Sequence, residues 1–141
     1  MNLVGTGMFA FVGFSFPTSK LLPTSYYKIT NKRLVTKIYD FWGVKYFRFF
    51  LLLTFWKSKE KQKTFFNGTK EGLRQFTFAL NQAEFGHLGA FIFIQIYGIA
   101  MFLKGEFLVF MILSIINIIF NLYPIILQRK HRVRIQGILE R

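Results

Sequence analysis

The 141-residue chain has no cysteine, only two histidines and only six acidic residues. Without cysteine, disulfides, S-palmitoylation and cysteine-ligated metal centres are excluded. The shortage of histidine and carboxylate also argues against a dedicated metal cage, so we expect no metal ion. Glu84 and His87 do have the i, i+3 spacing at which two side chains can share an ion. A glycine-rich phosphate loop is absent as well.

The chain is also poor in negative charge and rich in apolar residues. Nineteen Lys and Arg residues give a net charge of +13, 52% of the residues are hydrophobic, and 20 are Phe. The mean hydropathy is +0.35. A soluble domain of this size could not bury so much apolar surface, so lipid is the expected solvent. A charge of this sign can indicate nucleic-acid binding. Here the basic residues flank apolar segments, as they do in membrane proteins, and we expect no nucleic-acid partner.

Two long apolar stretches, residues 86–103 and 107–127, are separated only by Lys104-Gly105-Glu106. Their lengths, 18 and 21 residues, match a hydrocarbon core of about 30 Å at about 1.5 Å per helical residue. The sequence therefore predicts an all-α integral membrane protein built on a two-helix transmembrane hairpin.

Polar residues recur along both predicted helices at helical spacing. Glu84, His87 and Gln95 share one face at about 100° per residue. A second stripe consists of Asn117, Asn121, Gln128 and Arg132. Polar groups at this depth cost free energy unless they are paired or wetted, so their alignment predicts a functional site. Gln95 and Asn117 are better explained as hydrogen-bonding contacts between the helices.

Folding the chain at Gly105 brings the two polar stripes together near one membrane face. Glu84 is then level with about Leu127 and Gln128, and His87 is level with about Tyr123. Most of the polar residues thus crowd one end of the hairpin, which favours a site there.

The basic residues are unevenly distributed around the hairpin. Residues 20–74 contain 13 of the 19 Lys and Arg, residues 129–141 contain five, and the turn contains only Lys104. Because cytoplasmic segments carry the excess of Lys and Arg, we expect the long loop and the C-terminus to be cytoplasmic. We divide the chain into an N-terminal membrane helix (1–22), a cytoplasmic or interfacial basic-aromatic region (23–80), the hairpin with its basic exit (81–134) and a tail (135–141).

Two parts of this division rest on short apolar segments. Residues 1–16 are apolar without a basic leader region or cleavage site, and they predict a short first membrane helix. Between residues 32 and 56, apolar and aromatic residues alternate with Lys and Arg at helical spacing, but the run is too short to span a membrane. This pattern is typical of a helix lying at the membrane interface among anionic phospholipid headgroups. Packing of the same helix on the hairpin is the alternative.

We expect anionic lipid to contact the charge run formed by Lys57, Lys59, Lys61 and Lys63. Asn67-Gly68-Thr69 predicts a turn before a helix over residues 70–80.

Two motifs resemble a known family. Ala83-Glu84-Phe85-Gly86-His87 is followed by Asn121, then by Pro124-Ile125-Ile126 and Gln128-Arg129 with a basic ending. This arrangement is similar to that of the glycosyl-4,4'-diaponeurosporenoate acyltransferase family, small bacterial membrane proteins. Residues 32–57 show a weaker similarity. The chain departs from the family at Lys130, His131 and Val133, where members often have Tyr, Asn and Pro, and it lacks the Leu-Pro that often follows the Trp-Lys stretch.

The resemblance implies acylation of a sugar on a carotenoid, the last step toward a staphyloxanthin-like pigment, in the bacterial cell membrane. Another glycolipid acceptor is also compatible with the departures. The expected reaction moves a fatty acyl group from a thioester donor to a hydroxyl of a lipid-linked sugar. We expect no cofactor, and the donor, acyl-CoA or an acyl carrier, would act as co-substrate.

Roles for the polar residues follow from the needs of this chemistry. A base must take the hydroxyl proton, donors must stabilise the oxyanion, and cations must meet the donor's phosphates. His87 is the predicted base and Glu84 the group that holds its imidazole. Asn121 and Gln128 are the predicted amide donors. The predicted phosphate-binding residues are Arg129, Arg132 and Arg134.

Two other functions remain open from the sequence. The protein could be a non-enzymatic assembly or partner subunit whose polar stripes only fix helix packing. A cavity at Glu84 and His87 would favour the enzyme, and closure by side chains would favour the structural role. A transporter or channel would require a homo-oligomer, because three spans are too few to form a pathway alone.

Overall fold

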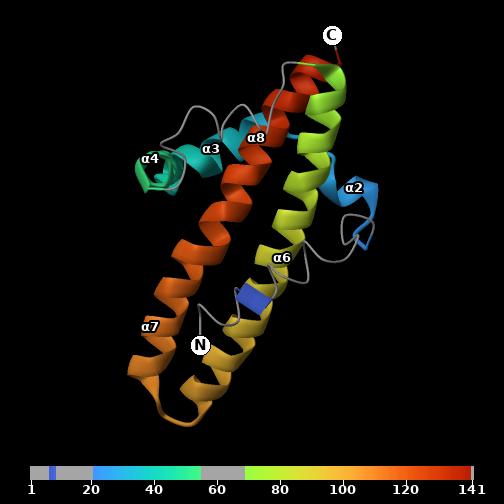
Figure 1. Cartoon of the computed structure of the whole chain (residues 1–141). Helices are drawn as coiled ribbons and strands as arrows, with labels where there is room; N and C mark the ends of the chain where they lie inside the picture. The colour runs from blue at the N-terminus through green and yellow to red at the C-terminus, as the bar shows by residue number, and fades with distance from the viewer. Residues whose placement is uncertain (1–6, 9–20, 55–68, 141) are drawn as a thin grey trace.

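The computed structural model describes residues 7–8, 21–54 and 69–140. Within those ranges the chain is helical and contains no β-strand (Figure 1). The predicted N-terminal membrane helix at residues 1–16, the Lys57–Lys63 run and the start of the Asn67-Gly68-Thr69 turn lie outside the described residues.

A long antiparallel hairpin dominates the fold. Its first arm is α6 (Lys70–Leu103), and its second arm consists of α7 (Phe107–Asn117), the π-helix η2 (Ile118–Leu122) and α8 (Tyr123–Leu139). The arms, 34 and 33 residues long, are long and apolar enough to cross a membrane. The predicted all-α class and helical hairpin are confirmed. Helix α6 runs without a break across the expected boundary at residue 80, and α8 continues beyond residue 134.

Local signals in the sequence fix where α6 begins and ends. Thr69 caps its start, with the side-chain oxygen accepting a hydrogen bond from the Gly72 N–H at 3.0 Å. At the other end Gly105 has φ +84°, a conformation that favours glycine. The Gly105 N–H donates to the Phe102 carbonyl and the Glu106 N–H to the Met101 carbonyl, both at 3.0 Å. These two bonds form a Schellman motif, which reverses the chain into α7.

The second arm contains a wider turn at η2. The Tyr123 N–H bonds to the carbonyl of Ile118, five residues back. The next residue, Pro124, has no N–H, so it cannot make the α-helical bond to Phe120. Both features remove regular i→i−4 bonds at this point, and the π-turn therefore lies in the middle of the arm.

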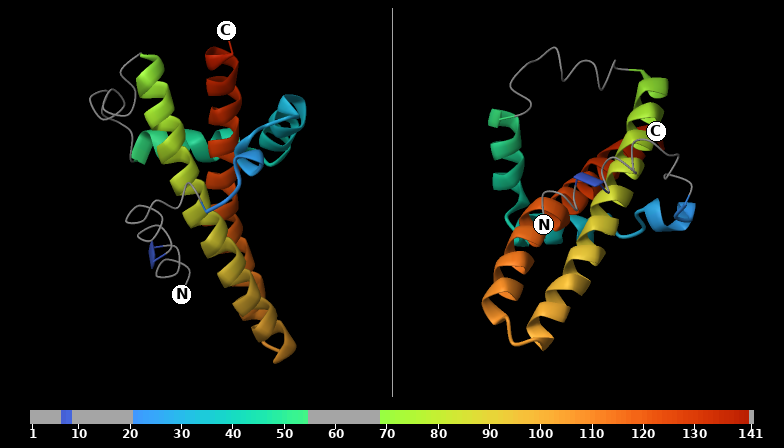
Figure 2. Two further views of the ribbon diagram at one scale, coloured as in Figure 1. Left: turned by 90° about the vertical axis from the view of Figure 1, so that its right-hand side faces the viewer. Right: turned by 60° about the horizontal axis from the view of Figure 1, so that its bottom comes forward.

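Three shorter helices pack beside the half of the hairpin that is farther from its turn (Figures 1 and 2). They are α2 (Thr24–Tyr27), α3 (Lys32–Phe41) and α4 (Val44–Thr54). Tyr39 and Val44 form a buried cluster with Ile126 of α8. The opposite face of α3 and α4 leaves large apolar side chains exposed, among them Leu34, Phe41, Tyr46, Phe49 and Phe50.

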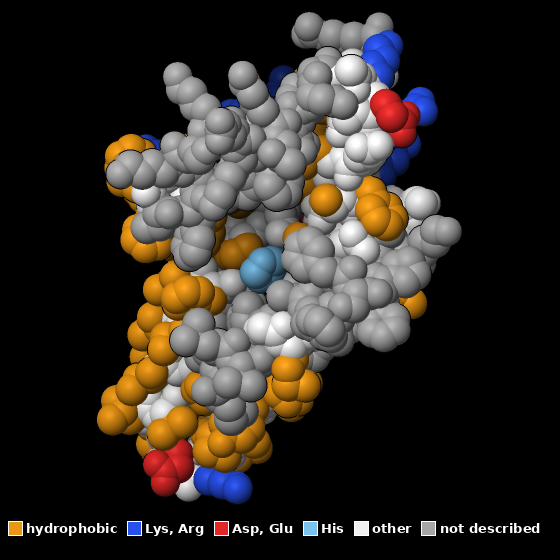
Figure 3. Space-filling view, in the orientation of Figure 1, with side chains coloured by type: hydrophobic (Ala, Val, Ile, Leu, Met, Phe, Trp, Pro, Cys, Tyr) orange, Lys and Arg blue, Asp and Glu red, His pale blue; other side chains and the backbone are white. Residues whose placement is uncertain are grey.

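Apolar side chains also cover the outside of the hairpin near its turn. Ile96, Leu103, Leu108 and Ile115 are each more than half exposed, with Leu103 reaching 79%. Figure 3 shows an apolar surface over this half of the molecule, with charged side chains at the two ends. Such a surface is suited to contact with lipid rather than with water.

Candidate functional site

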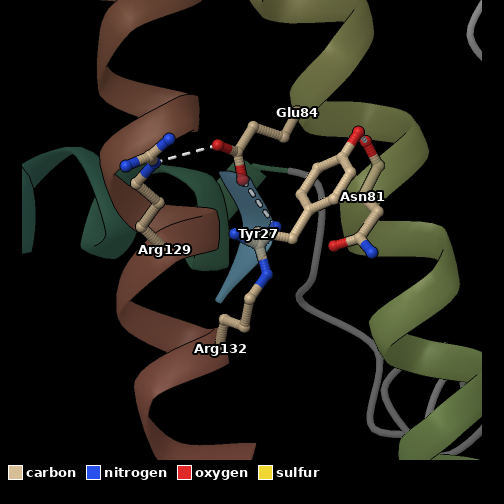
Figure 4. A network of polar contacts seen from close by, with 5 residues as sticks. All are labelled: Tyr27, Asn81, Glu84, Arg129 and Arg132. Atoms are coloured by element: carbon tan, nitrogen blue, oxygen red, sulfur yellow. Dashed lines mark hydrogen bonds and ion pairs between the residues drawn. The ribbon is translucent and has the colours of Figure 1, made fainter. Parts of the chain in front are cut away.

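A buried carboxylate lies at the centre of the polar end of the hairpin. Glu84 of α6 has no exposed surface. Its Oε1 accepts from Arg129 Nε at 2.9 Å, and its Oε2 accepts from Arg132 Nη2 at 2.5 Å. Both arginines come from α8, so this triad joins the two arms (Figure 4). A buried charge of this kind is tolerated only when it is paired, and Glu84 is paired twice.

Two tyrosines of α2 cover the arginines of this triad. The Arg129 guanidinium lies 4.8 Å from the Tyr26 ring centroid, and that of Arg132 lies 5.1 Å from the Tyr27 ring centroid. The Tyr27 hydroxyl donates to the Asn81 carbonyl at 3.4 Å. Burial, followed by the nearby Glu84 charge, raises the pKa of Tyr27 to about 12 and also raises that of Tyr26. Both rings therefore stay neutral at physiological pH and offer uncharged faces to the two cations.

A second set of polar contacts begins one helical turn deeper in the hairpin. His87 Nδ1 lies 3.2 Å from Asn121 Oδ1, and Asn121 Nδ2 donates to Asn117 Oδ1 at 2.8 Å. Asn117 Nδ2 donates to the Phe91 carbonyl at 3.0 Å. It also lies 3.4 Å from Gln95 Oε1. Asn117 and Asn121 are fully buried, whereas His87 is half-buried.

The direction of these hydrogen bonds defines the imidazole tautomer. The Phe91 carbonyl can only accept, so Asn117 turns its Nδ2 toward it and its Oδ1 toward Asn121. Asn121 in turn presents Oδ1 to His87, and that oxygen also only accepts. The Asn121 contact therefore favours a neutral imidazole with its N–H on Nδ1, and the Phe120 carbonyl is a further acceptor beside the ring. In that tautomer the lone pair is on Nε2, which is the nitrogen suited to accept a proton.

The structure brings most of the predicted site residues together, but in different pairs. Glu84 contacts Arg129 and Arg132 rather than His87, whose partner is Asn121. Gln128 is buried, and its Oε1 has no hydrogen-bond partner in the described part of the chain. Arg134 is exposed and lies apart from the Glu84 triad. In the described ranges no three His, Asp or Glu side chains gather in a way that could hold a metal ion.

Sequence reasoning missed the contribution of α2. Tyr26 and Tyr27 are separated from Glu84 by more than 50 residues, and no periodic pattern relates a four-residue helix to the hairpin. The available signal was the pair of tyrosines shortly after Pro23, in a chain with a large excess of Lys and Arg over acidic residues. That signal is too common to have identified a site.

Residues 23–141 match the family model described as glycosyl-4,4'-diaponeurosporenoate acyltransferase. The match covers all of the helices from α2 to α8. No curated protein and no solved structure matches the chain.

Proposed function

Because the chain belongs to the glycosyl-4,4'-diaponeurosporenoate acyltransferase family, we propose that it is a membrane acyltransferase acting on a lipid-linked sugar. The acyl group would come from a thioester donor, and the acceptor would be a hydroxyl of a glycosylated carotenoid or a related glycolipid. The observation that links this function to a site is the orientation of the His87 imidazole. Its Nδ1 is held by Asn121, which leaves Nε2 as the proposed proton acceptor.

The proposed reaction begins with proton transfer to His87. Nε2 takes the proton of the sugar hydroxyl as the hydroxyl oxygen attacks the thioester carbonyl carbon. A new C–O bond forms and the C–S bond breaks. The leaving thiolate recovers the proton from the imidazolium, giving an ester and a free thiol. No residue of the enzyme is consumed, and no cofactor is required.

The neighbouring polar residues receive different roles in this proposal. Asn121 holds the imidazole through its side-chain oxygen and is itself held by the hydrogen bond that its N–H donates to Asn117, so it is a positioning residue. Gln128, buried on α8, remains the proposed donor to the oxyanion. The Glu84 triad holds Arg129 and Arg132 at the end of the hairpin, where the donor's phosphates would arrive. Arg134, exposed on the same helix, is the proposed outer contact for those phosphates.

The long arms and their apolar exterior support a location in the bacterial cell membrane. We propose that the long basic loop and the C-terminus face the cytoplasm, because they carry nearly all the Lys and Arg. The exposed aromatic side chains of α3 and α4, beside Lys37 and Lys45, would then lie at the interface among anionic headgroups.

One observation favours the alternative of a non-enzymatic membrane subunit. Glu84 is completely enclosed and both of its oxygens are paired, as expected of a packing element. His87 differs, because the residue is partly exposed. The enzymatic and structural functions therefore make opposite predictions for a substitution of His87, and the experiment tests that residue.

The test replaces His87 with Ala in cells that make the glycosylated precursor. We expect acylated product to fall by roughly 10²- to 10⁴-fold, the usual contribution of a positioned proton acceptor, while the protein remains in the membrane at normal abundance. Lipid extraction and chromatography of precursor and product give the readout.

His131→Ala is the matched control. His131 is also half-buried and lies on α8 beside the Phe76 ring, but it is not part of the hydrogen-bonded set around Asn121. It should leave acylation within a few-fold of the parent. Full acylation by a normally expressed His87→Ala variant would show that the polar site serves helix packing and not catalysis.

A further inference from the structure

A cavity of about 440 Å³ lies next to the Glu84 triad. It is formed by α2, α6 and α8, and its polar lining includes Lys28, Thr77, Asn81, Arg132 and Gln136. Arg132 belongs both to this cavity and to the triad. The cavity therefore continues the polar end of the hairpin away from His87, toward the end of α8.

Several residues that line the cavity have buried polar atoms without a partner in the described part of the chain. Arg132 is 2% exposed and uses Nη2 for Glu84, but its Nε and Nη1 have no hydrogen-bond partner in the described part of the chain. The same holds for Asn81 Oδ1 and Gln136 Oε1. Figure 4 shows the Arg132 guanidinium and the Asn81 side chain on either side of the Tyr27 region. Buried polar groups normally find partners, so a ligand in the cavity would satisfy several at once.

The charge around the cavity favours an anionic ligand. Glu84 supplies one negative charge, while Arg129, Arg132 and Lys28 supply three positive charges. None of the described residues that line the cavity is acidic. Guanidinium and ammonium groups together are the usual partners of phosphate, and side-chain amides can turn their N–H groups toward the same oxygens.

We propose that this cavity binds a phosphate ester through Arg132 and Lys28, with Asn81 and Gln136 completing the contacts. Within the proposed function, on which this identification rests, the ester is the phosphopantetheine arm of the acyl donor. Asn81 and His87 are six residues apart on α6, about 9 Å along the axis. An extended arm with its phosphate in the cavity would therefore run along the hairpin toward the imidazole. A phospholipid headgroup offers the same phosphate chemistry.

Binding is tested with 4'-phosphopantetheine and with pantetheine, which differs only in lacking the phosphate. Isothermal titration on the detergent-purified full chain should show at least about 10-fold tighter binding of the phosphorylated compound, the effect expected of charge-assisted hydrogen bonds. Lys28→Gln should weaken its binding several-fold, and the remaining affinity should become less sensitive to salt. Lys37→Gln removes the same charge from the exposed surface of α3. It should change neither the affinity for 4'-phosphopantetheine nor the salt dependence of that affinity.

Gln136→Leu separates a ligand contact from a packing defect. The change removes an unpaired buried oxygen, so the variant should be at least as stable as the parent by thermal unfolding. If Gln136 contacts the phosphate ester, binding of 4'-phosphopantetheine should nevertheless weaken several-fold. Unchanged binding in both Lys28→Gln and Gln136→Leu would overturn the proposal, and so would equal binding of pantetheine and its phosphate.

Short-chain phosphatidic acid distinguishes the two sources of phosphate. Binding of phosphatidic acid that depends on Lys28 and Gln136, without binding of 4'-phosphopantetheine, would support the phosphate site and assign it to a lipid headgroup. Failure of this proposal is separable from failure of the acyltransfer proposal. Acyl transfer by a protein that binds neither phosphate overturns only the cavity assignment, whereas phosphate binding by a protein without transferase activity overturns only the catalytic one.

Discussion

At the scale of single residues, Glu84 is the most constrained side chain of the site. Its carboxylate is fully enclosed and is neutralised by two guanidiniums from the other arm. Each guanidinium is covered in turn by a tyrosine ring of α2. Removing the negative charge leaves two cations facing each other in a buried environment. The triad therefore depends on Glu84 more than on either arginine alone.

Glu84→Gln should destabilise the protein by about 3–5 kcal/mol, the usual result of removing one partner from a buried ion pair. Chemical or thermal unfolding in detergent measures the change. Glu106→Gln, an exposed carboxylate at the hairpin turn, should stay within about 0.5 kcal/mol of the parent. Replacing Arg129 by Gln in the Glu84→Gln background should recover part of the loss, because it removes one unpaired cation. Equal stability of the Glu84→Gln and Glu106→Gln variants would show that the triad does not stabilise the fold.

At the scale of secondary-structure elements, the π-turn η2 decides which face α8 presents to α6. Regular helical spacing places Gln128 on the stripe of Asn117 and Asn121, with Arg129 one position away. A π-turn adds about one residue and turns the following helix relative to the preceding one. In the structure Arg129 accordingly contacts Glu84, and Gln128 is buried without a partner for its Oε1.

The two polar stripes and their meeting could be predicted because helical periodicity and the short turn at Gly105 are both visible in the sequence. The pairing within the site could not, because it depends on η2. Pro124 indicates that one hydrogen bond is missing, but not whether the helix kinks, breaks or widens there. The tyrosines of α2 could not be placed either, since only tertiary packing brings them to the arginines.

Two glycines of the hairpin should respond in opposite directions to the same substitution. Gly105→Ala should destabilise the protein by roughly 1 kcal/mol or more, because φ +84° is unfavourable for alanine. Gly137→Ala should stabilise it by about 0.5–1 kcal/mol, because alanine restricts the unfolded chain and favours the helix. An added Cβ meets no atom of the described residues within 4 Å at either position, so packing among them does not interfere. Thermal unfolding of the two variants under identical conditions gives the comparison, and a shift of the same sign in both would contradict it.

At the scale of the whole molecule, the two ends of the hairpin differ in their charged groups. The start of α6 and the end of α8 lie at one end, and α2 and α3 lie beside the same half of the hairpin (Figure 1). That end contains the Glu84 triad and the proposed phosphate cavity, whereas the opposite end is the short turn at Lys104 to Glu106. An anionic substrate would therefore be drawn to the end with the site.

Cysteine labelling can test the orientation in this cysteine-free chain. Lys37→Cys and Glu71→Cys are exposed at the basic end, and Lys104→Cys is exposed at the turn. An impermeant thiol reagent added to intact cells should label only Lys104→Cys, since the positive-inside tendency places the basic end in the cytoplasm. All three should react after the membrane is opened. Labelling of Lys37→Cys in intact cells would reverse the orientation.

The division of the Glu84 triad between the two arms has a consequence for biosynthesis. Helix α6 leaves the ribosome before α8, so Glu84 is made 45 residues ahead of Arg129. A lone carboxylate within a helix disfavours insertion into lipid, and the cost rises with the depth at which the carboxylate lies. The cost is removed only when the arginines arrive. Helix α6 should therefore stay in the translocation machinery until α8 has been synthesised, and the two arms should enter the bilayer as a pair.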